Sequence, residues 1–219
     1  MSETIDQPQQ TSTASCDDPI AMRLPDETWL EVLEQLDYRG LKKVERVCKR
    51  MQRLVKDKHL DTLLFRQKPS KPLQRGDKVE LHPLIGMVDA VFTSKEEAPI
   101  LVYSDDVDTL NALGYQACDD FATQPACTSL KLDVLVGPSF TAKNESGVSC
   151  RDVFEAVANF WESKPPRDLA EQAAIWEGCK PDQIGWHIML GDHNGWRKWT
   201  LPKVRRDGSV QIQATGYDS

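Results

Sequence analysis

Two patterns of apolar positions divide the chain. From about residue 22 to residue 67, apolar side chains recur three and four positions apart, which is the period of an amphipathic helix. Between Ser129 and Gly137 the sequence SLKLDVLVG alternates instead, as a half-buried strand does. WHIML at residues 186–190 and SVQIQAT at residues 209–215 also allow a strand. The change of period predicts a small helical module followed by a mixed α+β domain with antiparallel strands and two helices.

Turn-forming and polar segments set the expected boundaries. The sequence KPSKPLQRGDK contains Pro and Gly, which interrupt both periodicities and indicate a linker. The first twenty residues contain too few apolar side chains to offset their chain entropy, so we expect them to be disordered. The expected units are a tail at residues 1–20, a helical module at 21–67, a linker at 68–80, an α+β domain at 81–205, and a terminal strand and tail at 206–219.

The two expected helices of the α+β domain have recognisable ends. Ser149 can cap the helix CRDVFEAVANFWES, and Asp152 stands three residues later, where a capping-box partner belongs. A Pro-Pro pair opens the second helix, RDLAEQAAIWEG, and Gly178 stands where a C-terminal cap belongs. Asp207 and Gly208 separate two apolar segments and predict a hairpin turn.

The helical module has a continuous apolar face. Trp29, Val32, Leu33 and Leu36 share one side of the first helix, and after a break at residues 37–40 the same spacing continues. Lys and Arg residues fall largely between the later apolar positions. A module of roughly 45 residues has little interior of its own. Some of these apolar side chains therefore remain exposed unless a partner covers them.

The sequence LPDETWLEVLEQLDYRGLKKVERVCKRMQRLV, at residues 24–55, resembles an F-box. It begins with Leu-Pro-x-Glu, continues with an apolar helix, and ends in a Val-Cys-Lys-Arg stretch. The similarity extends loosely to Arg66. Thr28, Gly40 and Met51 depart from the family pattern, in which an aliphatic residue, an acid and often a tryptophan stand at these positions. Methionine fills irregular apolar gaps, so packing is expected to survive the last of these changes.

The resemblance implies a function. F-box proteins are substrate-receptor subunits of SCF-type cullin–RING ubiquitin ligases, in which the F-box binds a Skp-family adaptor and the rest of the chain binds a protein substrate. Cullin and RING subunits are then indirect partners, and the chain itself is not an enzyme. The resemblance assigns adaptor binding to Leu24, Pro25, Trp29, Val32, Leu33, Leu36, Leu41, Val44, Val47, Cys48 and Met51.

Other interpretations remain open. The protein could bind the adaptor as a scaffold or regulator without directing ubiquitination. The helical segment could also be one lobe of a single domain, or a small DNA-binding module, although no Asn or Gln stands among its arginines as in a recognition helix. A stand-alone enzyme or ligand-binding domain is the third class. The C-terminal half diffusely resembles uncharacterised fungal F-box proteins, which suggests no activity.

Composition restricts these alternatives. The net charge of −7 argues against a dedicated nucleic-acid or membrane binder. No apolar run approaches the roughly 20 residues that cross a bilayer, and no secretory pattern opens the sequence. The six cysteines are scattered without a Cys-x-x-Cys pair, so we expect reduced thiols and a cytoplasmic or nuclear protein.

Candidate chemistry is sparse in the C-terminal half. Cys179, His187 and His193 lack the spacing of a zinc site, so no metal or cofactor is expected. Asp119 and Asp120 are adjacent acids, and the sequence alone brings no second group to them. The tryptophans are expected mainly to fill the core between helices and sheet. Some could instead form the substrate surface, and the candidates for it are Trp186, Trp196, Arg197 and Trp199.

Overall fold

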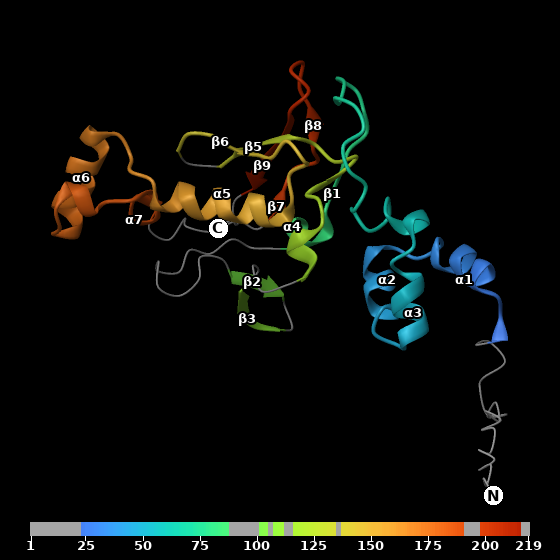
Figure 1. Ribbon diagram of the computed structural model, residues 1–219. Helices are drawn as coiled ribbons and strands as arrows, with labels where there is room; N and C mark the ends of the chain where they lie inside the picture. Colours follow the sequence, from blue (N-terminus) through green and yellow to red (C-terminus); the bar gives the residue numbers. More distant parts are fainter. Residues whose placement is uncertain are drawn as a thin grey trace, which may run out of the picture.

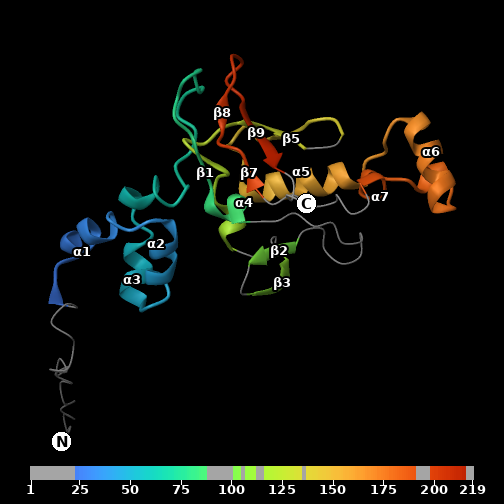
Figure 2. The ribbon, with the colours of Figure 1, turned by 180° about the vertical axis from the view of Figure 1, so that it is seen from behind.

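The computed structural model describes residues 23–87, 101–104, 107–111, 116–134, 137–190 and 198–215. The expected disordered tail, residues 1–20, lies outside these ranges. The helical module occupies one end of the molecule, a sheet covered by one long helix lies in the middle, and helix α6 lies at the opposite end (Figures 1 and 2). The fold is α+β, as the sequence predicts.

The helical module consists of α1 (Asp26–Leu33), α2 (Tyr38–Val44), α3 (Lys49–Leu54) and the 3-10 helix η2 (Lys58–Leu60). The break between the first two helices lies at residues 34–37 rather than at the expected 37–40, because the Asp37 side chain caps α2 by accepting a hydrogen bond from the Gly40 backbone N–H at 2.7 Å. The helices enclose a separate core formed by Leu33, Leu41, Met51, Leu54, Val55, Leu60 and Leu64.

The linker has no regular secondary structure, but it packs against the C-terminal half. Residues 68–79 contain no helix or strand, in agreement with the Pro- and Gly-rich sequence. Leu73, however, is only 7% exposed and belongs to the main core of the C-terminal half. The Leu73 carbonyl also lies beside Gly208, where an added Cβ would approach it to 3.1 Å. The linker is thus packed along the C-terminal domain.

The described part of the C-terminal half contains three sheets. β1 (Glu80–Leu81) pairs with β4 (Thr123–Gln124), and β2 (Leu101–Ser104) pairs with β3 (Val107–Asn111). The largest sheet has the order β6-β5-β9-β7, and β8 also pairs with β9. Its strands are β5 (Ser129–Asp133), β6 (Phe140–Lys143), β7 (Lys198–Trp199), β8 (Lys203–Val204) and β9 (Val210–Thr215).

Strand β9 changes the expected end of the α+β domain. It lies in the middle of the largest sheet and runs parallel to β5, with Leu130 opposite Val210, so the sheet contains one parallel pair beside its antiparallel pairs. The domain expected to end at residue 205 therefore continues to Thr215. Chain position at the end of a sequence does not reveal such a central strand, because pairing with β5 is a long-range contact. The Asp207-Gly208 turn joins β8 and β9 as predicted, with Gly208 at a φ of 78°.

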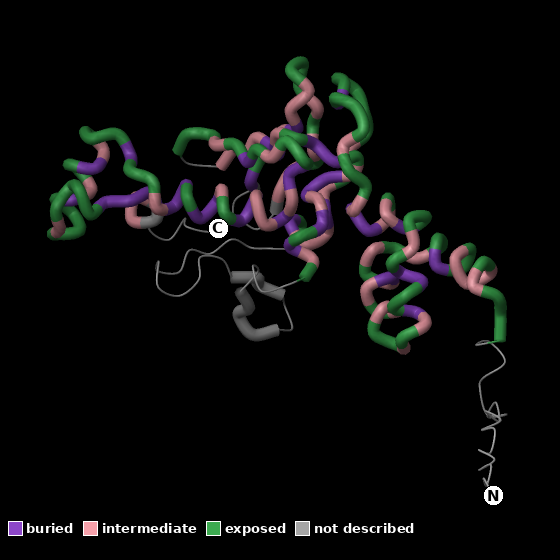
Figure 3. Tube along the Cα trace, in the orientation of Figure 1, coloured by how far each residue is buried: buried purple, intermediate pink, exposed green. Residues whose placement is uncertain are grey.

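Helix α5 (Cys150–Glu162) covers the sheet (Figure 3). The predicted capping box is present: the Asp152 N–H donates to Ser149 Oγ at 3.1 Å, and the Ser149 N–H donates to Asp152 Oδ2 at 2.8 Å. Its buried side chains recur at helical spacing and meet Leu130 and Leu132, which are fully buried on β5. The buried apolar residues of α5 are Cys150, Val153, Phe154, Val157, Ala158, Phe160 and Trp161.

Beyond α5 the chain forms a helical arm made of α6 (Arg167–Glu177), the 3-10 helix η5 (Pro181–Gln183) and α7 (Trp186–Leu190). Gly178 ends α6 in the left-handed conformation, as predicted. The strand interpretation of WHIML is wrong, because these residues form α7. A short apolar run does not distinguish a strand from a buried helical turn, and here Trp186 stacks on Phe160 with ring centroids 5.7 Å apart. Two other short helices, α4 (Pro83–Met87) and η4 (Gln116–Asp119), flank the smaller strands.

Candidate functional site

The helical module presents apolar side chains to solvent near its N-terminal end and again before α3. Leu24 is 39% exposed, Val32 46% and Val47 71%, and Pro25 is exposed between the first two. Exposure of several large apolar residues on a module this small is the property expected of a surface that a partner covers. These four residues are the members of the expected adaptor-binding set that the fold leaves open.

A charged clamp fixes the position of the first helix. Arg50 donates to the Asp26 carboxylate from both Nε (2.8 Å) and a terminal nitrogen (2.6 Å), and it also donates to the Leu24 carbonyl at 2.5 Å. Arg53 adds a contact of 2.9 Å to the same carboxylate. The hydrogen bond from Arg50 is the main cause that lowers the pKa of Asp26, and Arg53 contributes to the same shift. The Val-Cys-Lys-Arg stretch of α3 thereby holds the Leu-Pro segment in place.

Three expected adaptor contacts instead belong to the interior. Leu33 is 1% exposed, Leu41 0% and Met51 3%, and all three pack together in the module core. Periodicity identifies an apolar face but does not divide it into residues that face the module and residues that face a partner. These three side chains therefore support the exposed apolar residues from inside the module.

The remaining four members are half-buried. Trp29, Leu36, Val44 and Cys48 each pack against the module core while keeping some exposed surface. The indole nitrogen of Trp29 is buried without a hydrogen-bond partner. Trp29 is therefore less exposed than the sequence pattern suggests.

A cleft of about 660 Å³ opens beside Cys48, between α2, α3 and η4. The cationic residues Lys42, Arg46 and Lys49 line it together with one acid, Glu45. An acidic partner approaching Cys48 would meet this positive charge, which favours rapid encounter more than it adds affinity.

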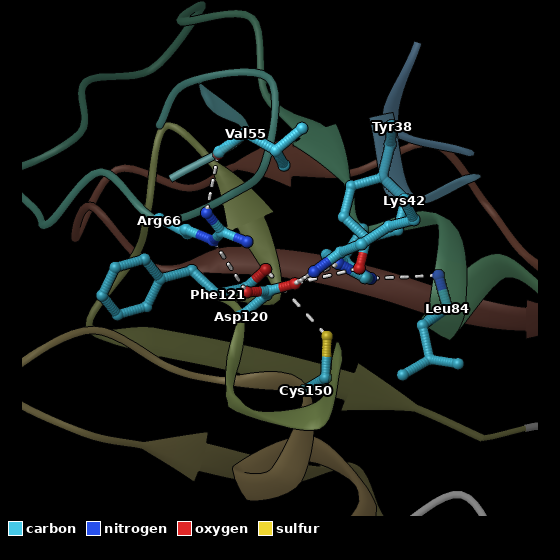
Figure 4. A network of polar contacts seen from close by, with 9 residues as sticks. Tyr38, Lys42, Val55, Arg66, Leu84, Asp120, Phe121 and Cys150 are labelled. Atoms are coloured by element: carbon cyan, nitrogen blue, oxygen red, sulfur yellow. Dashed lines mark hydrogen bonds and ion pairs between the residues drawn. The ribbon is translucent and has the colours of Figure 1, made fainter. Parts of the chain in front are cut away.

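A buried polar network joins the helical module to the C-terminal half (Figure 4). Its centre is Asp120, whose side chain is 10% exposed. Tyr38 donates to the Asp120 carboxylate at 2.9 Å, Lys42 lies 3.2 Å from it, and Arg66 lies 3.6 Å from it. All three donors come from the module, and the acceptor follows η4 of the other half. The sequence presents Asp120 only as one of two adjacent acids, so this role was not predicted.

Aromatic rings close the same junction. The fully buried His82 lies edge-on to Tyr38 (4.5 Å between centroids) and to Phe65 (4.8 Å). Phe65 adopts a φ of 55°, which is costly for a residue with a side chain. Its carbonyl accepts a hydrogen bond from the Phe121 N–H at 2.7 Å. The module and the C-terminal domain are therefore connected by packing as well as by charge.

Protonation at the junction follows from this geometry. Burial lowers the pKa of His82, whose Nδ1 accepts a hydrogen bond from the Leu84 N–H at 3.0 Å. Burial would raise the pKa of Asp120, but His82, Lys42 and Tyr38 outweigh it and hold that pKa below its usual value. Burial and the Asp120 charge raise the pKa of Tyr38. The junction thus contains a carboxylate, a neutral imidazole and a protonated phenol.

The expected substrate surface is not assembled as predicted. Trp186 is 5% exposed and belongs to the main core, so it is not available for binding. Trp199 is half-buried against the same core, while Trp196 and Arg197 lie outside the described residues. Trp161 is 1% exposed and confirms the expectation of core tryptophans. Trp176 behaves differently, because on α6 it is 88% exposed.

Comparison with known proteins identifies the helical module. Residues 21–67 match the F-box-like family model, so the chain contains an F-box-like domain at its N-terminal end. No curated protein and no solved structure is significantly similar to the chain. The resemblance of the C-terminal half to fungal F-box proteins stays a prediction. An F-box-like domain indicates binding to a Skp-family adaptor in an SCF-type context, and proteins of this family are generally non-catalytic adaptors.

Within the described ranges, no helix is long and apolar enough to span a membrane. In the same part of the chain, no three His, Cys, Asp or Glu side chains are placed to hold a metal ion.

Proposed function

We propose that this protein is a substrate-receptor subunit of an SCF-type cullin–RING ubiquitin ligase. The F-box binds a Skp-family adaptor, which connects the chain to cullin and RING subunits, and the C-terminal domain binds a protein substrate. The chain has no catalytic role of its own and works in the cytoplasm or nucleus. The observation that carries the proposal is the F-box-like domain at residues 21–67, with its apolar residues left exposed.

The junction supports this division of labour. A receptor must hold its substrate at a defined position relative to the adaptor, and a flexible tether would not. Here Asp120 is bound by Tyr38 and Lys42 from the F-box, and the linker packs its Leu73 into the C-terminal core. These contacts hold the two halves in a fixed orientation relative to each other.

Adaptor binding can be tested with a pair of matched variants. Leu24→Ala combined with Pro25→Ala removes the exposed start of α1, and truncation of a buried interface anchor commonly costs at least about 2 kcal/mol, or about 30-fold in affinity. Leu201→Ala is the control, because Leu201 is 84% exposed in the C-terminal half. We expect isothermal titration with purified adaptor to show the loss in the first variant and unchanged affinity in the control.

Two results would contradict the proposal. Wild-type affinity in the Leu24→Ala, Pro25→Ala variant would remove these residues from the adaptor interface. Normal adaptor binding without ubiquitin transfer to any co-purified protein, in a ligase reconstituted with cullin and RING subunits, would favour the scaffold or regulator function instead.

A further inference from the structure

Helix α6 has an inverted distribution of side-chain size. It packs Ala170 and Ala174 inward against Ile184, and both alanines are 5% exposed. Of its three large apolar residues, Leu169 is half-buried against the main core, whereas Ile175 is 81% exposed and Trp176 is 88% exposed. An amphipathic helix that served only to fold would bury the large residues and expose the small ones. Folding therefore does not explain Ile175 and Trp176.

Acidic residues outnumber basic ones on α6. Asp168, Glu171 and Glu177 are all exposed. Asp168 stands in the first turn of α6, Glu171 pairs with Arg167 at 2.8 Å, and Glu177 directly follows Trp176. The last turn of α6 contains no basic residue. The unpaired carbonyls at a helix C-terminus carry partial negative charge, and Glu177 adds a full charge at the same place. The last turn of α6 thus carries negative charge beside the apolar pair.

Both features define what would fit this surface. An apolar side chain would cover Ile175 and part of the indole of Trp176. A Lys or Arg next to it would meet Glu177 and the helix terminus, and it could also lie over the indole face. An acidic or purely apolar segment would leave the negative charge without compensation.

The position of α6 suits a receptor. The F-box helices and α6 lie at opposite ends of the molecule in both views (Figures 1 and 2). A segment bound at α6 would therefore leave the exposed Leu24, Val32 and Val47 of the F-box free for another partner.

We propose that the C-terminal end of α6, formed by Ile175 and Trp176 together with Glu171 and Glu177, is the docking surface for a protein segment that pairs an apolar anchor with Lys or Arg. This surface, which we call the α6 end, deepens the proposed function, because it would be where the substrate binds. It takes the place of Trp186 as the expected substrate contact, because Trp186 is buried in the main core.

The test uses the full chain and three synthetic, fluorescently labelled peptides of equal length. The first peptide places Leu at a spacing of three and four residues and Lys between them, as in an amphipathic helix. The second replaces every Lys with Glu, and the third replaces every Leu with Ser. We expect fluorescence anisotropy to show binding of the Leu/Lys peptide at least about tenfold tighter than that of either control. We also expect this binding to weaken at high salt, since exposed charges contribute to it.

Variants of the chain assign the binding to the α6 end. Ile175→Ala with Trp176→Ala should weaken the Leu/Lys peptide at least about tenfold, whereas Leu201→Ala, which removes an equally exposed apolar residue elsewhere, should leave affinity within about twofold. Glu177→Lys should weaken the Leu/Lys peptide and strengthen the Leu/Glu peptide. Circular dichroism of each variant shows whether it is folded.

Four outcomes overturn the proposal. The Leu/Lys peptide does not bind, it binds the α6 variants and the control like wild type, or the three peptides bind equally. The fourth is that sedimentation shows a dimer that the Trp176→Ala variant loses. The last would make a second copy of this chain the occupant. None of these measurements contains the adaptor, so failure here is separate from failure of the F-box titration.

Discussion

The two ends of this molecule expose apolar residues for different structural reasons. At the F-box end, large residues such as Leu33 and Leu41 fill a true core, and Val32 and Val47 remain outside because the module is too small to enclose them. At the α6 end, alanines fill the contact and Trp176 is left outside. Cations outnumber acids in the lining of the F-box cleft, whereas acids outnumber cations on α6.

This difference shows which exposed residues a sequence can reveal. Val32 and Val47 belong to a family pattern that extends over many positions, so they could be assigned to a partner-binding segment before the fold was known, although the pattern did not separate them from buried members such as Leu33. Trp176 belongs to no such pattern, and a tryptophan on a helix is usually assigned to the core. Its exposure becomes visible only when Ala170 and Ala174 are seen to face inward.

The largest expected effect separates two tryptophans on neighbouring helices. Trp161 is 1% exposed in the main core, so Trp161→Ala should lower the free energy of unfolding by about 3–5 kcal/mol. Trp176→Ala should change it by no more than about 0.5 kcal/mol, because a surface residue makes few contacts to lose. Chemical denaturation of both variants measures the difference. Comparable destabilisation by the two would show that α6 packs its tryptophan, and the contrast between the ends would disappear.

Sequence reasoning succeeded where local chemistry decides the structure. The capping box of Ser149 and Asp152, the Gly178 helix end and the Asp207-Gly208 turn depend on neighbouring residues, and all three are present. It failed where distant segments meet. The parallel pairing of β9 with β5, and the contact of Asp120 with Tyr38, join residues that no local pattern connects.

The site followed the same division. The family pattern located the adaptor-binding segment but not the inward orientation of Leu33, Leu41 and Met51, because burial depends on how the helices pack. The Asp26–Arg50 clamp was also missed, although both residues stand in the motif. An acid in the first turn of α1 and an arginine on α3 would have been the signal for it.

The second prediction concerns the junction, which ties the F-box to the sheet, while α6 has its own small alanine core. Asp120→Asn removes the charge that Lys42 and Arg66 share in a largely buried site. Loss of one partner of a buried ion pair commonly lowers the free energy of unfolding by about 3–5 kcal/mol. Because both cations are partly exposed, we expect the loss in Asp120→Asn to lie near the lower of these values. We expect hydrogen exchange to accelerate in α2 and leave α6 unchanged.

The adjacent residue provides the control. Asp119 is an exposed acid that pairs with Arg151 at 3.0 Å, so Asp119→Asn should cost less than about 1 kcal/mol. Equal effects of the two substitutions would mean that the Asp120 network adds no more than a surface pair. Faster exchange in α6 as well as α2 would mean that the whole chain unfolds together, and the two ends could not be treated as separate units.

The smallest expected effect is a pH dependence at the junction. Burial lowers the pKa of His82, so the unfolded chain takes up a proton near pH 6.5, before the folded chain does. Stability contributed by the neutral His82 is therefore complete above about pH 6.5 and is lost as the pH falls below it. Asp120, whose pKa is also lowered, loses its contribution only below about pH 4, so acidification from pH 7 to 5 reports mainly on His82.

His82→Asn tests this assignment, because an Asn carbonyl can replace Nδ1 as the acceptor for the Leu84 N–H but does not titrate. The variant should melt at a lower temperature at every pH, since its side chain no longer packs on Tyr38 and Phe65. Its melting temperature should also fall less than that of wild type between pH 7 and 5. His59, whose pKa is raised mainly by its hydrogen bond to Asp57, changes stability in the opposite sense but is present in both proteins, so it cancels. Parallel pH profiles would show that His82 gains its proton as readily in the folded chain as in the unfolded one, and the junction would then be no more acid-sensitive than the α6 end.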